Sequence, residues 1–106
     1  MHIELHKGEK ILKKGHANYY ENHLLNTGRL YLTNERIYFS SHPLNFKKVG
    51  ITMPLQEVTG VELRNNYKVF SHGFYIVMHN GTKHHFAVWQ RRRWKKIINE
   101  VIAAQA

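Results

Sequence analysis

The stretch GRLYLTNERIYFS, residues Gly28 to Ser40, carries the clearest structural signal in the chain. Its apolar residues alternate with polar or amphipathic ones at the two-residue period of a β-strand. A two-residue turn at Asn34-Glu35 divides the stretch into two strands, and asparagine tolerates the positive φ that such turns often need. This turn would bring four apolar side chains onto one face in two facing pairs, Leu32 with Ile37 and Leu30 with Phe39. The stretch therefore predicts a β-hairpin with one buried side.

A second hairpin is predicted within GFYIVMHNGTKHHFAVW, residues 73–89. A two-residue loop at Asn80-Gly81 would pair Ile76 with His85 and split the apolar residues between two faces. A three-residue loop, Asn80 to Thr82, with Gly81 at positive φ, keeps them together. We expect this bulged turn, with two resulting pairs, Ile76 with Phe86 and Phe74 with Val88.

The remaining pattern predicts shorter strands and one helix. Residues 50–55 and 58–63 alternate as strands, with Pro54 suited to an edge or a strand end. The segment from Gly8 to Asn26 predicts a strand interrupted near Gly15. The segment from His42 to Val49 predicts a loop. From Gln90 the apolar period becomes helical on a single face, formed by Trp94, Ile97, Ile98, Val101 and Ile102. The count is about seven strands followed by a C-terminal amphipathic helix.

Length and composition favour one small domain of 106 residues without disulfides, because the chain has no cysteine. No apolar run reaches the roughly 18 residues of a spanning helix, so we expect a cytoplasmic protein that meets membranes only from the surface. Lysine and arginine number 16 against seven glutamates, a net charge of +9 spread over both halves. This charge favours anionic partners, although it could also serve solubility alone.

Catalytic and metal-binding patterns are absent from the sequence. Without cysteine or aspartate, the usual nucleophile triads cannot form, and no glycine-rich phosphate loop is present. The nine histidines include no helical i, i+4 pair. His79 could approach His84 or His85, but two imidazoles without an acid make a weak site. We therefore expect no enzyme activity, no metal and no cofactor.

Three segments together resemble a known family: LLNTGRLYLTNERIYFSS, VGITMPLQEVTGVEL and FYIVMHNGTKHHFAVW, followed by the terminal helix. They are similar to a GRAM domain of the pleckstrin-homology-like superfold, over about Gly8 to Ile102 of a single domain, residues 1–106. The resemblance implies a mainly β barrel of two nearly orthogonal antiparallel sheets, about seven strands, capped by the C-terminal α-helix. It also implies a binding module for lipids or peptides.

One departure concerns the basic signature that phosphoinositide-binding pleckstrin homology domains carry on their first two strands. Here Lys13 and Lys14 lie in the first strand and Arg29 in the second. The intervening GHANYYENHLLNTG is polar and aromatic, so it does not present a tight cationic pocket.

The loop between the third and fourth predicted strands is the first candidate ligand site. Phe46 beside Lys47 and Lys48 suits an interface where lipid tails meet anionic headgroups. By the resemblance, Lys14, His16 and Lys83 would lie near the same end. The alternative is that Phe46 packs back onto the core while the lysines are solvated.

The run RRRWKK, Arg91 to Lys96, is the second candidate. It begins the helix, where the helix dipole disfavours cations. Trp94 falls on the apolar face and is expected in the core. Arg91, Arg92 and Arg93 would dock an anionic partner, or they are simply tolerated at a small electrostatic cost.

The first functional hypothesis is a small binding module that associates weakly with anionic membrane lipids. The alternative is a protein-interaction or self-association module, using the strand edge beside Pro54 or the sheet face bearing Tyr75 and Val77. A lower alternative is nonspecific nucleic-acid binding through the helix patch. The sequence leaves the headgroup and the oligomeric state open.

Overall fold

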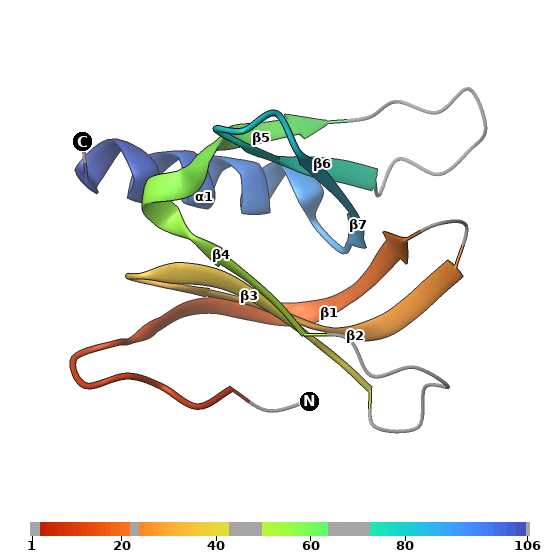
Figure 1. Cartoon of the computed structure of the whole chain (residues 1–106), viewed down its shortest axis with the longest axis horizontal. Helices are drawn as coiled ribbons and strands as arrows, with labels where there is room; N and C mark the ends of the chain where they lie inside the picture. The colour runs from red at the N-terminus through yellow and green to blue at the C-terminus, as the bar shows by residue number, and fades with distance from the viewer. Residues whose placement is uncertain (1–2, 22–23, 43–49, 64–72, 106) are drawn as a thin grey trace.

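The computed structural model describes residues 3–21, 24–42, 50–63 and 73–105. Within these ranges the chain forms seven antiparallel strands and then one α-helix (Figure 1). The strands are β1 (Ile11–Glu21), β2 (Leu24–Thr33), β3 (Arg36–Ser41), β4 (Gly50–Pro54), β5 (Val58–Leu63), β6 (Gly73–Met78) and β7 (Lys83–Val88). A short 3-10 turn, η1 (Leu55–Glu57), joins β4 to β5, and α1 spans Arg91–Gln105.

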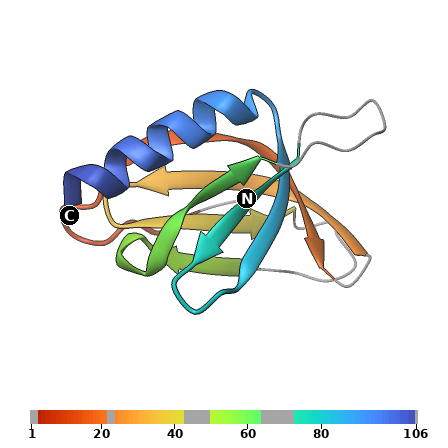
Figure 2. The same cartoon turned by 90° about the horizontal axis from the view of Figure 1, so that it is seen from above.

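The strands follow the order β4-β3-β2-β1-β7-β6-β5, so β4 and β5 are the two end strands. Strand β1 is eleven residues long and pairs with β2 on one side and β7 on the other. It therefore connects the layer formed by β1–β4 to the layer formed by β5–β7 and α1 (Figure 1). Figure 2 shows β5–β7 crossing over β2 and β3, with α1 along one side. The predicted mainly β fold with a terminal helix is confirmed.

The first hairpin has the predicted register. Leu32 pairs with Ile37 and Leu30 with Phe39, and all four side chains are fully buried. The turn lies at Asn34-Glu35, as the alternation of the sequence indicates. Strand β4 adds its residues beside β3 and ends at Pro54, which matches the expected edge position.

The second hairpin differs from the predicted register by two positions. Phe74 pairs with Phe86, and the Met78 N–H donates to the Thr82 carbonyl at 2.8 Å. The three-residue loop is therefore residues 79–81, one residue earlier than expected, with Gly81 at φ 89° as predicted. The Asn80 side chain stabilises this closure by accepting from the Thr82 N–H at 2.9 Å. Because a slip of two positions preserves the alternation, the same apolar face is still buried.

Strand β1 is not interrupted near Gly15, contrary to the prediction. Gly15 pairs with Leu30, and the irregularity falls earlier, between Ile11 and Lys13. The Trp94 ring lies over Gly15, where an added Cβ would be 3.5 Å from the ring. Gly15 therefore lies beneath the helix tryptophan within a strand that continues through it.

The core lies between the inner face of the sheet and α1. Trp94 and Ile98 are buried as predicted, and Ile97, Val101 and Ile102 pack against the core from partly buried positions. Each fully buried apolar side chain of this size contributes about 1.5–3 kcal/mol to stability. Of the loop predicted from His42 to Val49, only His42 lies in the described part, and its N–H donates to the Thr27 carbonyl at 2.7 Å.

A buried carboxylate fixes the N-terminal segment to the first hairpin. Glu9 accepts from the Thr33 hydroxyl at 2.6 Å and from the His6 N–H at 2.9 Å. It also accepts from Nε and Nη2 of Arg36, at 2.8 and 3.1 Å. The Arg36 hydrogen bond, outweighing the opposing effect of burial, lowers the pKa of Glu9 from 4.5 to about 2.

Asn34 extends this attachment to both ends of the described chain. Its backbone N–H donates to the Lys10 carbonyl at 3.1 Å, and its Oδ1 accepts from the Lys10 N–H at 2.7 Å. Its Nδ2 donates to the Gly8 carbonyl at 3.2 Å. Its own carbonyl accepts from Gln105 Nε2 at 2.6 Å. The hairpin turn thus binds the N-terminal segment and the end of α1 at one point.

Glu9 should dominate the acid sensitivity of the fold. Its carboxyl stays charged to a lower pH in the folded than in the unfolded chain, so its contribution is complete above about pH 5 and is lost towards pH 2. A shift from 4.5 to about 2 corresponds to roughly 3 kcal/mol of unfolding free energy. We expect Glu9→Gln to lower stability by about this amount at pH 7 and to approach the stability of the wild type near pH 2. Urea unfolding across this pH range measures it.

The matched control is Glu57→Gln, which changes an exposed glutamate at the 3-10 turn. It should follow the wild-type pH profile throughout. A constant stability gap between Glu9→Gln and wild type from pH 7 to pH 2 would contradict the assigned role of the ionised carboxylate.

Gly28 should tolerate no side chain. A Cβ added there would lie 2.8 Å from both Phe39 Cζ and Ser41 Cα and would also meet the Ser40 carbonyl oxygen. Because backbone cannot move aside cheaply, Gly28→Ala should cost about 2–3 kcal/mol. Gly15→Ala places the same methyl group at ordinary contact distance and should cost less than about 1 kcal/mol. Thermal denaturation of both variants tests the contrast, and equal losses would refute it.

Candidate functional site

A partly open pocket of about 520 Å³ lies beside the β2–β3 turn. Its lining comes from the N-terminal segment, the turn, β4, η1 and the end of α1, and includes His6, Glu35, Arg36, Thr52, Gln56 and Gln105. The pocket therefore borders the same junction that Glu9 and Asn34 hold together.

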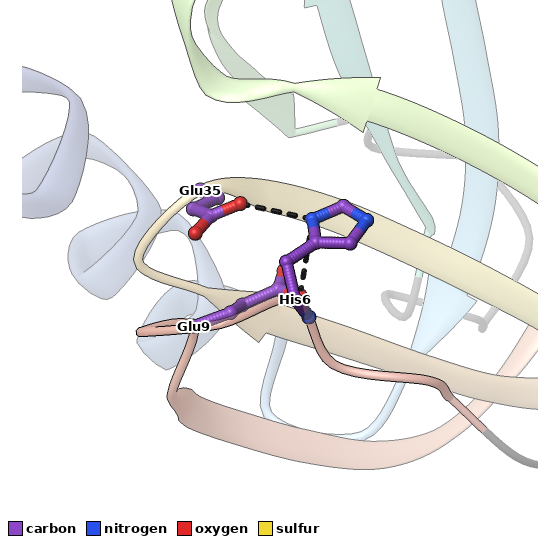
Figure 3. A group of neighbouring side chains, drawn as sticks. All are labelled: His6, Glu9 and Glu35. Atoms are coloured by element: carbon purple, nitrogen blue, oxygen red, sulfur yellow. Dashed lines mark hydrogen bonds and ion pairs between the residues drawn. The ribbon is translucent and has the colours of Figure 1, made fainter.

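Three potential metal ligands meet at this junction (Figure 3). His6 Nδ1 lies 3.0 Å from a Glu35 oxygen and 3.6 Å from a Glu9 oxygen. However, each Glu9 oxygen already accepts two hydrogen bonds, and a carboxylate offers about four acceptor positions in total. A metal would have to displace one of these bonds beside the Arg36 cation. The arrangement therefore fits a structural network better than a metal centre.

Arg91 does not belong to the exposed patch predicted at the start of α1. It is 5% exposed, and its Nη1 donates to the Gly73 carbonyl on β6 at 3.0 Å. The chain reverses at Gln90, which has φ 60°, and this turn directs Arg91 to the same buried side as Trp94 and Ile98. The prediction of an exposed Arg91 is wrong, because helical spacing places this residue on the same face as Trp94.

Arg92 and Arg93 are exposed on the first turn of α1, and that turn contains no acidic residue. Trp89, immediately before the helix, is 72% exposed, the largest value among the exposed large hydrophobic residues of the described chain. We call Trp89, Arg92 and Arg93 the helix-start surface. Trp89 was not among the predicted site residues. The alternation of β7 contains the signal, because Phe86 and Val88 face inward and the next odd-numbered residue therefore faces outward.

Of the residues predicted at the loop end, the structure places Lys14 and Lys83 far apart. Phe46, Lys47 and Lys48 lie outside the described residues. Tyr20 on β1 pairs with His85 on β7, and the two strands are antiparallel. Lys14 lies six positions from this pair towards the start of β1. Lys83 lies two positions from it in the opposite direction. At roughly 3.3 Å per residue this separates the two lysines by about 26 Å. Lys83 also forms an ion pair of 2.9 Å with Glu62.

The inner side of the sheet near Tyr19 is apolar rather than cationic. The Tyr19 ring packs against Phe39 and Phe86, with centroids 5.7 and 5.0 Å away. His84 lies beside Tyr19, and burial lowers its pKa, which favours the neutral imidazole. This part of the interior therefore offers no positive charge to a ligand.

The outer face bears an aromatic row across three strands. The His85 ring lies between Tyr20 and Tyr75, with both centroids at 4.7 Å. Leu25 of β2 pairs with Tyr20 and is 54% exposed. Tyr75 belongs to the sheet face, bearing Tyr75 and Val77, that is the predicted alternative surface for a protein partner.

The continuous sheet, the terminal helix and the apolar interior define a pleckstrin-homology-like fold. A family model described as the GRAM domain matches residues 1–103. The chain therefore belongs to the GRAM domain family.

Solved structures support the fold. The chain is similar to the C-terminal domain of an unknown protein from Leishmania infantum, at 18% identity and a TM-score of 0.77, covering 92% of this chain and 87% of that one. It is similar to the Vps36 N-terminal PH domain, at 12% identity and a TM-score of 0.75, covering 95% and 84%. The Slm1 PH domain, solved with inositol 4-phosphate, matches at 12% identity and a TM-score of 0.61, covering 88% and 95%.

A sequence comparison with curated proteins finds no match. GRAM and pleckstrin-homology-like domains are typically non-catalytic binding modules. The helix in the described part of the chain is too short and too polar to cross a membrane.

Proposed function

We propose that this domain associates weakly with the surface of anionic membranes through the helix-start surface. The observation that carries the proposal is Trp89, 72% exposed and followed by two exposed arginines. Tryptophan favours the membrane–water interface because its ring is large and apolar while its N–H can still bond to water. The adjacent arginines supply the positive charge that anionic headgroups attract.

Magnitudes support weak rather than tight association. Each arginine near an anionic surface contributes about 1 kcal/mol at low salt, and this contribution falls as salt increases. Two arginines and one tryptophan therefore give a reversible contact. Lys47, Lys48 and Phe46 remain the predicted second contact, and stable anchoring of peripheral proteins generally takes two signals. The Slm1 PH domain, which has the same fold, was solved with inositol 4-phosphate, and this supports an anionic headgroup as the class of ligand in general terms.

Removing the two exposed arginine charges should weaken vesicle binding. We expect Arg92→Gln/Arg93→Gln to lower the affinity for vesicles with a high content of phosphatidylglycerol about thirtyfold, equivalent to roughly 2 kcal/mol. Co-sedimentation at low and physiological salt measures the change.

The matched control is Lys7→Gln/Lys10→Gln, which lowers the net charge of +9 by the same two units. These lysines are exposed near the other end of α1, because Lys10 and Gln105 both contact Asn34. The control should bind nearly as well as the wild type. Equal losses in both variants, or complete stripping by duplex DNA, would mean that only nonspecific charge is involved.

The fluorescence of Trp89 should report whether its side chain inserts into the membrane. The chain has two tryptophans, and the other, Trp94, is 2% exposed and shielded from solvent. Anionic vesicles should therefore shift the fluorescence emission of the wild type to shorter wavelength, while Trp89→Phe should show almost no shift. An unchanged wild-type spectrum under conditions where the protein co-sediments would exclude Trp89 from the interface.

A further inference from the structure

The two end strands of the sheet differ in how well their outer edges are protected. In the described part of the chain, β4 and β5 each have a strand partner on one side only. Strand β5 has an irregularity between Val58 and Gly60, and α1 packs along it, with Asn99 Oδ1 3.6 Å from a Cβ added to Gly60. Bulges and covering helices are common means of blocking a sheet edge. Strand β4 pairs with β3 in regular register, so its edge lacks such a bulge.

The pairing of β4 with β3 determines which backbone groups reach the outer edge of β4. The Leu55 N–H donates to the Glu35 carbonyl at 3.0 Å, so the residues that bond to β3 are every second one counted back from Leu55. In an antiparallel pair, the intervening residues direct their N–H and C=O away from the partner strand. On β4 these are Gly50, Thr52 and Pro54. Gly50 and Thr52 therefore direct a donor and an acceptor each to the edge, whereas Pro54 directs only its carbonyl.

The pocket of about 520 Å³ lies at the proline end of this edge. Thr52 and Pro54 line it from β4, Gln56 from η1 and Glu35 from the β2–β3 turn. Its volume falls in the range of sites that hold a small ligand. In a strand added to the edge, the residue opposite Pro54 would project on the same face as Pro54 and its partner Arg36, which also lines the pocket. One side chain of the added strand is therefore directed into the pocket.

The charges around the pocket indicate which side chain it would accept. The Arg36 guanidinium donates to the Glu9 carboxylate at 2.8 Å and its side chain is 11% exposed, so its charge is already compensated. The Glu35 side chain is 40% exposed, and among the described contacts its carboxylate uses only Oε1, which lies 3.0 Å from His6 Nδ1 (Figure 3). A lysine or arginine would bring a positive charge and N–H donors to the second oxygen. The pocket therefore favours a cationic side chain.

A second copy of this chain fits the edge poorly. Two β4 strands paired antiparallel about Thr52 would place the other copy's glycine opposite Pro54, and glycine has no side chain to enter the pocket. Each copy also carries a net charge of +9, which opposes association. A strand from another protein can carry a cationic residue at that position. The occupant that suits both the edge and the pocket is therefore an extended peptide segment of a different protein.

We propose that the outer edge of β4 binds an extended segment of a partner protein in antiparallel orientation, with a lysine or arginine side chain in the pocket beside Glu35. The backbone of the segment bonds to Gly50 and Thr52, and its residue opposite Pro54 donates to the proline carbonyl. The carbonyl of that same residue meets no N–H on Pro54, and the exposed Gln56 side chain, just beyond it, can donate instead. The backbone bonds supply affinity and the pocket supplies selectivity.

This site is separate from the helix-start surface. Gln105, which lines the pocket, is the last residue of α1, whereas Arg92 and Arg93 lie in its first turn. At 1.5 Å per residue, the helix separates them by about 18–20 Å. The domain can therefore hold a membrane surface and a peptide segment at the same time, and the peptide site does not depend on the membrane association.

An NMR titration with a designed peptide tests the site. The probe is an acetylated and amidated heptapeptide with glutamate at both ends, lysine at its third position, and valine and threonine elsewhere. Its fifth residue is designed to pair with Thr52 and its third with Pro54. We expect saturable amide shifts concentrated on β4, η1 and the β2–β3 turn. Lysine to glutamine in the peptide and Glu35→Gln in the protein should each weaken binding about fivefold, and the two together should weaken it no more than either alone.

Methylation of single peptide amides separates strand addition from a contact made by side chains alone. A methyl group on the amide of the fifth residue removes a donor that faces β4 and should weaken binding about tenfold or more. A methyl group on the amide of the fourth residue points away and should change the affinity less than about twofold. Thr52→Pro removes the matching donor from the protein at an edge position where proline is tolerated. Thr52→Val keeps this donor and should bind as the wild type does.

Arg92→Gln/Arg93→Gln should leave peptide binding unchanged, so failure of the membrane proposal is distinguishable from failure of this one. Equal losses from the two methylated peptides, or shifts centred on β5 and α1, would overturn the proposal. The absence of any shift at about 1 mM peptide would also do so. A dimer in sedimentation experiments that Thr52→Pro dissociates would contradict it as well, because a second copy would then occupy the edge of β4.

Discussion

The buried ion pair between Glu9 and Arg36 is the constraint on which the first half of the fold depends. Isolated ion pairs at a protein surface contribute little, because solvent screens them and two long side chains must be ordered. This one is different, since the Glu9 side chain is fully buried and all its acceptor positions are used. Breaking one partner would leave a buried charge uncompensated, a costly state. The N-terminal segment therefore cannot leave the hairpin without a large loss of stability.

This pair also explains the part of the sequence that most resembles the family. Apolar alternation accounts for Leu30, Leu32, Ile37 and Phe39, but it does not account for the polar T-N-x-R portion between them. In the structure, Thr33 and Arg36 donate hydrogen bonds to the Glu9 carboxylate. Asn34 forms hydrogen bonds with the backbone of Lys10 and Gly8. A motif that reads as a turn from the sequence is thus also an attachment point for two other segments.

A feature could be predicted from the sequence when the interactions that determine it join residues close together in the chain. The first hairpin and the buried helix face were predictable because residue periodicity alone determines them. The second hairpin was predicted on the correct face but two positions out of register, because a hydrogen bond from Thr82 to Asn80 decided where the loop closes. The roles of Glu9 and Arg91 depend on neighbours far away in the chain, so they could not be predicted from the sequence. Arg91 in particular changes from a presumed ligand contact to a buried donor for the β6 carbonyl of Gly73.

The convergence on Asn34 has a mechanical consequence. Gly8, Lys10 and Gln105 are all hydrogen-bonded to this one residue, so the N-terminal segment and the end of α1 are held at the same corner of the fold. Tension applied between the ends would then pass through this corner, and it would not run across the sheet or through the ladder of β1 with β7. The surface formed by β1, β2 and the start of α1 lies away from this corner, so it would be less exposed to such tension.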